Sequence, residues 1–176
     1  RGLLALPDRC AGGRSLVLCH PHPAGGGSMD VGLLETMETR ASRAGFAVLR
    51  FDFAGVGRSS GAFTDGLDEP CDVAAACGFV RGLGEVDPSK LAVAGWSFGA
   101  WMALLALGEG LEAACCVAVS PPLALYDWRS AAPAIAASTV ERHYIAGADD
   151  RLCPLESLRA FTGAAGERDS ANTMVL

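Results

Sequence analysis

LAVAGWSFGA occupies residues 91–100 and joins an apolar run to a serine flanked by glycines. The first four residues are typical of a buried strand, and apolar residues at helical spacing follow over 101–107. A Gly-x-Ser-x-Gly pattern between a strand and a helix predicts a sharp, strained turn that presents Ser97 at the end of the strand. Glycines are expected at 95 and 99 because a larger side chain would collide with the neighbouring backbone. We therefore interpret Ser97 as a candidate nucleophile, with an ordinary strand-to-helix turn as the alternative.

Length and composition predict one domain over residues 1–176. Hydrophobic residues make up 51% of the chain, which is enough for a large core. The formal net charge of −6, without a basic cluster, argues against a nucleic-acid partner. The longest apolar run, 91–107, contains Gly95, Ser97 and Gly99, which favours a buried strand and helix over a membrane span. We expect no nucleic-acid and no membrane partner.

The cysteines predict a reducing, cytoplasmic environment. There are seven of them, with no C-x-x-C pair, and several fall inside apolar segments, so they are typical of small buried hydrophobes. The chain begins at Arg1 and stops inside the apolar run 174–176. We therefore expect a fragment that is incomplete at both ends, with any targeting segment outside it.

Apolar strand patterns alternate with helical ones along the chain. Such strands, apolar throughout rather than at every second residue, predict a parallel sheet covered on both faces. Residues 2–6 and 15–19 are expected to form an opening hairpin. Ligands of parallel sheets bind outside the carboxyl ends of the strands. The segments that should therefore meet in one crevice are 20–29, 52–61, 95–99 and 147–154.

These segments together resemble the α/β-hydrolase superfamily, and within it the small lidless members that carry a H-P-H-P-x-x-G-G-x-M loop. The matching pieces span nearly the whole chain in the family's order: residues 20–29, 51–61, 95–100 and 147–154. The resemblance implies an α/β-hydrolase fold, with a mostly parallel sheet, helices on both faces, no large lid domain and a truncated C-terminal end. It further implies a serine hydrolase that needs no cofactor and no metal.

Asp150 is the candidate acid of a catalytic triad. The resemblance implies the chain order Ser, Asp, His, and the segment 147–154 is similar to the family's G-x-x-D-x-x-V-P pattern. That pattern places the acid at Asp150, with adjacent Asp149 as the fallback. The alternative is an Asp-Asp turn that only caps the helix expected from Leu155.

The oxyanion hole is assigned to His22 and Phe98. The resemblance gives the 20–29 loop this task, and Pro21 and Pro23 have no N–H to donate. The His22 N–H is then expected to act with the Phe98 N–H at the start of the helix. His20 is expected to be a structural hydrogen-bonding residue, with the role of a substitute base as its alternative.

The base is expected outside the given chain. The three histidines, His20, His22 and His143, all precede Asp150, and His143 is expected to be a half-buried strand residue. The simplest account places the base histidine shortly after Leu176, so the chain as given should be nearly inactive.

The leading hypothesis is hydrolysis of an ester, thioester or amide bond of a small soluble substrate through an acyl-enzyme on Ser97. A non-catalytic binding or assembly protein of the same fold is the alternative. A metal site through His20 and His22 with Asp149 or Asp150 is weaker, because the prolines fix the ring directions. Nucleotide binding by the glycines of 52–61 is disfavoured, since no lysine accompanies them.

Overall fold

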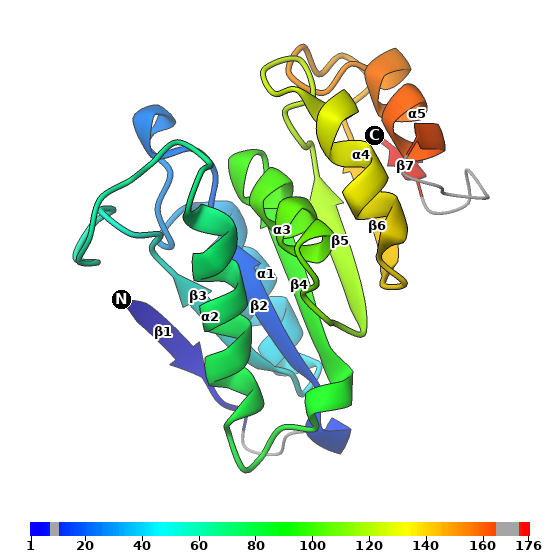
Figure 1. Ribbon diagram of the computed structural model, residues 1–176. Coiled ribbons are helices and arrows are strands. Elements are labelled where there is room, and N and C mark those ends of the chain that lie inside the picture. The colour runs from blue at the N-terminus through cyan, green and yellow to red at the C-terminus, as the bar shows by residue number, and fades with distance from the viewer. Residues whose placement is uncertain (8–10, 165–172) are drawn as a thin grey trace.

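A single mixed sheet organises the computed structural model, which describes residues 1–7, 11–164 and 173–176 (Figure 1). The strand order is β1-β3-β2-β4-β5-β6-β7, and β1 alone runs antiparallel, against β3. The strands are β1 (Gly2–Ala5), β2 (Ser15–Cys19), β3 (Ala47–Phe51), β4 (Leu91–Trp96), β5 (Cys115–Val119), β6 (Glu141–Ala146) and β7 (Thr173–Val175). The predicted mostly parallel sheet is confirmed.

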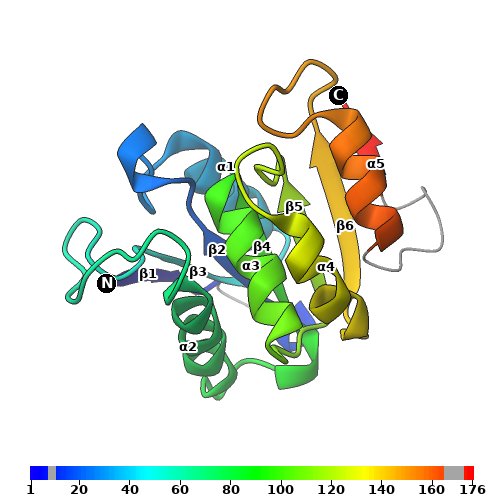
Figure 2. The ribbon, with the colours of Figure 1, turned by 45° about the horizontal axis from the view of Figure 1, so that its top comes forward.

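Helices cover both faces of the sheet. The α-helices are α1 (Gly32–Arg43), α2 (Glu69–Arg81), α3 (Phe98–Gly108), α4 (Trp128–Ala137) and α5 (Leu155–Ala164). Helix α1 lies on one face, and α2, α3, α4 and α5 lie on the other (Figures 1 and 2). Residues 120–140, between β5 and β6, hold α4, which packs against α3 and α5, so no large lid domain interrupts the described chain.

The central strands are apolar on both sides because each side faces a helix layer. On β2, Val17 belongs to the larger core shared with α2 and α3, whereas Leu18 packs toward Leu34 of α1. Both strand side chains are fully buried. This explains the absence of simple alternation in the sequence of these strands.

The predicted opening hairpin is wrong. Strand β1 pairs with β3, and β2 lies between β3 and β4, with parallel neighbours on both edges. The central position satisfies the hydrogen-bonding groups of β2 on both sides, whereas a hairpin with β1 would displace one of these neighbours.

The described cysteines are all free thiols, and Cys10 lies outside the described residues. Burial raises the pKa of Cys116 and of Cys153 to about 12, as expected for thiols in an apolar interior. Among the described helices, none combines the length and the apolar character that a bilayer span requires.

Candidate active site

Ser97 occupies a strained backbone position between β4 and α3. Its φ of 54° and ψ of −118° lie outside the conformations that side-chain-bearing residues favour, at a cost on the order of 1–3 kcal/mol. The Ser97 N–H donates to the carbonyl of Val119, and its own carbonyl accepts from Trp101 at the first turn of α3. These two hydrogen bonds therefore hold the turn, and Ser97 lies half-buried directly after the carboxyl end of β4.

The two glycines of the motif are required by close backbone approach. A Cβ at Gly95 would lie 2.3 Å from the carbonyl carbon of Gly99. A Cβ at Gly99 would lie 2.3 Å from the carbonyl oxygen of Cys19, at the end of β2. The expected collision is confirmed at both positions, and α3 begins directly against the 20–29 loop.

His20 is a neutral structural residue. Its ring is fully buried, its Nδ1 lies 2.6 Å from the carbonyl oxygen of Pro21, and its Nε2 accepts the Phe53 N–H at 3.2 Å. This pairing assigns the proton to Nδ1. Burial lowers the pKa of His20, because the charged form loses its hydration. Both ring nitrogens are engaged, which favours the predicted structural role over that of a base.

His22 faces the start of α3 with its ring fixed in place. Its Nδ1 accepts the Ala24 N–H at 3.1 Å, so its Nε2 carries the proton and donates to Asp65 Oδ1 at 2.8 Å. The ring also contacts Phe63 and Phe98 edge-on, with centroid separations of 5.2 and 5.1 Å. The two residues predicted to form the oxyanion hole are thus neighbours.

Asp150 lies beyond the carboxyl end of β6. Its Oδ1 accepts the N–H groups of Leu152 and Cys153, at 2.8 and 3.1 Å. These bonds fix the carboxylate on the turn before α5 (Leu155–Ala164), but the two N–H groups precede the helix and are not its first-turn donors. Asp149 is exposed and does not line the cavity described next.

A cavity of about 650 Å³ brings together three of the four predicted site residues, whereas the buried Phe98 does not line it. Ser97, Asp150 and His22 all line it. Its walls also include apolar side chains from α1, β4 and the turn after β6: Val31, Leu33, Trp96 and Leu152. Loops 20–29, 95–99 and 147–154 therefore meet as predicted, whereas 52–61 does not line this cavity.

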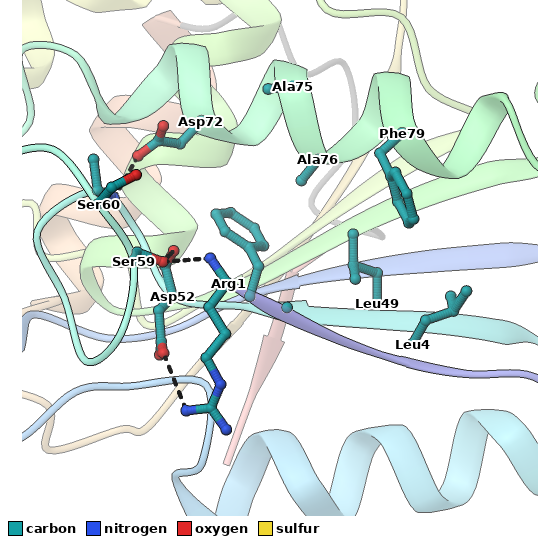
Figure 3. Close-up of a pocket in the computed structure, with 13 residues that line it drawn as sticks. Arg1, Leu4, Leu49, Asp52, Ser59, Ser60, Asp72, Ala75, Ala76 and Phe79 are labelled. Atoms are coloured by element: carbon teal, nitrogen blue, oxygen red, sulfur yellow. Dashed lines mark hydrogen bonds and ion pairs between the residues drawn. The ribbon is translucent and has the colours of Figure 1, made fainter.

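Loop 52–61 instead borders a separate pocket of about 410 Å³ between β1, β3 and α2 (Figure 3). Asp52 lines this pocket, and its carboxylate lies 4.0 Å from the guanidinium of Arg1. The Ser59 hydroxyl donates to the backbone carbonyl of Asp52. A Cβ at Gly57 would lie 2.6 Å from Asp52 Oδ2. Gly57 of this loop thus packs against a carboxylate, which disfavours phosphate binding there.

Comparison with known proteins identifies the family of this chain. The Alpha/beta hydrolase family is matched over residues 16–173. The chain belongs to this family. An uncharacterized protein of Rickettsia prowazekii (strain Madrid E) is 35% identical over 122 residues, which cover 68% of this chain and 50% of that protein. The matched part of the chain thus spans about half the length of this curated relative.

Two solved structures resemble this chain closely. An alpha-beta serine hydrolase homologue from Coxiella burnetii is 25% identical, with a TM-score of 0.82 over 99% of this chain and 80% of that one. XC6422 from Xanthomonas campestris, a serine hydrolase without a lid, shares the fold at 24% identity, with a TM-score of 0.79 over 99% and 76% of the two chains. Both likenesses support a lidless α/β-hydrolase fold.

His143 lies within β6, before the carboxyl ends of the strands. It is half-buried opposite Val117, and its Nε2 is 3.3 Å from Glu141 Oε1. The predicted strand role is confirmed. Among the described residues, no cluster of three His, Cys, Asp or Glu side chains could hold a metal ion. The engaged ring nitrogens of His20 and His22 further disfavour the metal alternative.

Sequence reasoning missed two features in and near this candidate site. Ser120, directly after β5, lines the cavity with a φ of 46°, and its N–H donates to the Ile145 carbonyl. Arg50 is buried within β3, and its side chain bonds the carbonyl of Met29. A lone charge inside an otherwise apolar strand was the available signal for Arg50, because a buried guanidinium needs partners.

Proposed function

We propose that this α/β hydrolase cleaves an ester, thioester or amide bond of a small soluble substrate through an acyl-enzyme on Ser97. The observation that carries the proposal is the single cavity lined by the strained Ser97, the Asp150 carboxylate and His22. A serine hydroxyl becomes an effective nucleophile only when a base takes its proton and an acid orients that base. A strained serine sharing a cavity with a carboxylate supports this arrangement.

The remaining roles follow from the backbone of the site. The N–H groups of His22 and Phe98 would hold the oxyanion, since Phe98 begins α3 and the first N–H groups of a helix have no acceptor within it. Asp150 would orient the base. His20, His22 and His143 each have other partners, so we propose that the base is a histidine following Leu176 in the full reading frame.

The cavity favours a small acyl substrate with an apolar group. Leu33 and Leu152 are 39% and 45% exposed, although they are large and apolar. Lining side chains of this kind, around a few polar groups, are typical of small-molecule sites. No cofactor, nucleic acid or membrane surface enters the proposal, and the free thiols support a cytoplasmic location.

A non-catalytic binding or assembly protein of the same fold is the second candidate, because the described histidines leave Ser97 without a base. The residues after Leu176 discriminate the two. A histidine within a few positions supports the enzyme, and its absence supports the binding protein.

The direct test is labelling of the full-length protein by a fluorophosphonate probe, which reacts with activated serines. We expect rapid labelling of the natural protein, none in Ser97→Ala and strongly slowed labelling in Asp150→Asn. Ser89→Ala is the matched control. Ser89 directly precedes β4, at the amino end of that strand, so this variant should label at the natural rate. Unlabelled natural protein, or equal labelling of Ser97→Ala, would overturn the proposal.

A further inference from the structure

Arg50 carries a buried charge near the carboxyl end of β3, the strand next to the edge strand β1. Its side chain is 8% exposed, donates to the Met29 carbonyl and to Glu38, and lies 3.4 Å from Asp30 Oδ1. A guanidinium withdrawn from water is tolerated only when its donors are satisfied. The Met29 carbonyl is one of the groups that satisfy it, so the end of the 20–29 loop is bound to β3.

Asp52 binds the backbone N–H of Met29, the second polar backbone group of that residue. Its Oδ1 accepts the Met29 N–H at 2.9 Å, and its side chain is 2% exposed. The Met29 side chain is itself fully buried. Two side chains at the carboxyl end of β3 thus hold the N–H and the carbonyl of one peptide segment in a dry environment, where such bonds are strong.

Met29 is connected to His22 through the glycine run. The N–H groups of Gly25 and Gly27 both donate to the His22 carbonyl, at 3.0 and 3.1 Å. Gly27 also packs directly on the Pro21–His22 peptide. Residues 20–29 contain only one short 3₁₀ turn, Pro23–Gly25, so their position depends on what holds the two ends of the loop.

We propose that Arg50 and Asp52 are positioning residues that hold Met29, and through it the His22 N–H, in place for the oxyanion. This inference rests on the proposed function, which makes that N–H an oxyanion donor. A donor stabilises the transition state most when it needs no reorganisation as the charge develops. Without these anchors the Met29 end of the glycine-rich loop would lose two of its hydrogen bonds and could reorganise.

Substitutions in the full-length protein test this role by the split between kcat and KM on p-nitrophenyl acetate. Arg50→Met and Asp52→Ala should each lower kcat about tenfold or more and change KM by less than about threefold, because an oxyanion donor acts mainly in the transition state. Asp52→Asn keeps an oxygen that can accept the Met29 N–H and should restore most of kcat. The double variant should lose less than the product of the two single losses, because both side chains hold the backbone of one residue, Met29.

Arg142→Met is the matched control. Arg142 is also a buried arginine on a strand, and it donates to the carbonyls of Ile135 and Ser138, near the end of α4. Its loss should lower the temperature of thermal unfolding, and the loss of Arg50 should do the same. It should leave kcat near the natural value at temperatures where the protein is folded.

Amide hydrogen exchange separates this inference from the proposed function. Exchange over residues 22–29 should become faster in Arg50→Met and Asp52→Ala and stay unchanged in Arg142→Met, whether or not the protein hydrolyses any ester. Unchanged exchange there, or a folded Arg50→Met protein with natural kcat, would overturn the inference. Equal losses of kcat in Arg50→Met and Arg142→Met would also overturn it, since a general loss of stability would then suffice. Natural protein that resists fluorophosphonate would instead refute the proposed function.

Discussion

Alanine substitutions along Gly25, Gly26 and Gly27 test whether the position of the His22 peptide matters for activity. A Cβ at Gly25 would have no heavy atom within 4 Å. Gly26 has open space too, but its φ is +83°. A Cβ at Gly27 would lie 1.9 Å from the Pro21 carbonyl oxygen and 2.7 Å from that of His22. Three neighbouring positions thus separate the effects of added volume, backbone strain and direct collision.

The expected effects follow from these distances. Gly25→Ala should change the free energy of unfolding little, or stabilise the fold by up to about 1 kcal/mol through the unfolded state. Gly26→Ala should cost about 1–2 kcal/mol, the penalty of a left-handed conformation. In Gly27→Ala the shortest contact falls about 1.1 Å below the 3.0 Å at which real Cβ contacts begin, so the Pro21–His22 peptide must move. A displacement near 1 Å can reduce turnover about 100-fold, or about 2.7 kcal/mol in activation free energy.

The assay combines thermal unfolding with the rate of fluorophosphonate labelling of the full-length protein. Gly27→Ala should label far more slowly than Gly26→Ala even where both are fully folded, and Gly25→Ala should label at the natural rate. If folded Gly27→Ala labels as fast as Gly25→Ala, the His22 peptide is not part of the oxyanion hole. The reasoning would also be refuted if labelling followed only the loss of stability across the three variants.

Three further outcomes are expected. Gly99→Ala should lower both the unfolding temperature and the labelling rate, since its Cβ would lie 2.3 Å from the Cys19 carbonyl oxygen; an unchanged unfolding temperature would contradict this. Because burial lowers the folded-state pKa of His20 below its unfolded value of about 6.5, stability should be complete above that pH and fall as pH drops through it, where the unfolded chain binds the extra proton. Denaturant titrations between pH 7.5 and 5 should show a shallower fall in His20→Asn, and equal slopes would argue against a neutral His20. Cys71 is exposed, so Cys71→Ser should remove one rapidly reacting thiol in a disulfide-exchange assay at pH 8, whereas an unchanged count would place Cys71 out of reach.

The parts of the site that sequence predicts are those fixed by local backbone geometry. Gly95 and Gly99 encode a close approach within a few residues, so their spacing alone indicates the turn at Ser97. The convergence of His22 and Asp150 on one cavity follows from strand direction, because the ends of parallel strands share an edge. The expectation of a parallel sheet was therefore enough to bring together residues far apart in the chain.

The features that the sequence did not predict depend on which strands pair in the sheet and on which side chains meet across the packed elements. Nothing in residues 2–5 distinguishes pairing with β2 from pairing with β3, since both partners are apolar strands. The partners of Arg50 come from the loop before α1 and from α1 itself, and no local pattern names them. Their side chains meet only after β3 and α1 have packed, so the pattern could indicate a buried charge but not its function.

One backbone contact helps to set the separation between Ser97 and His22. Strands β2 and β4 pair with Cys19 opposite Gly95, and Gly99 then packs on the Cys19–His20 peptide. Ser97 lies between the two glycines, and His22 lies two residues beyond that peptide. A shift at this contact therefore moves nucleophile and oxyanion donor relative to each other, whereas a change at Asp150, which is carried by β6, leaves that separation intact. For this reason loss of the acid should slow activation of Ser97 without altering amide exchange in the 20–29 loop, and a Gly99 substitution should alter both.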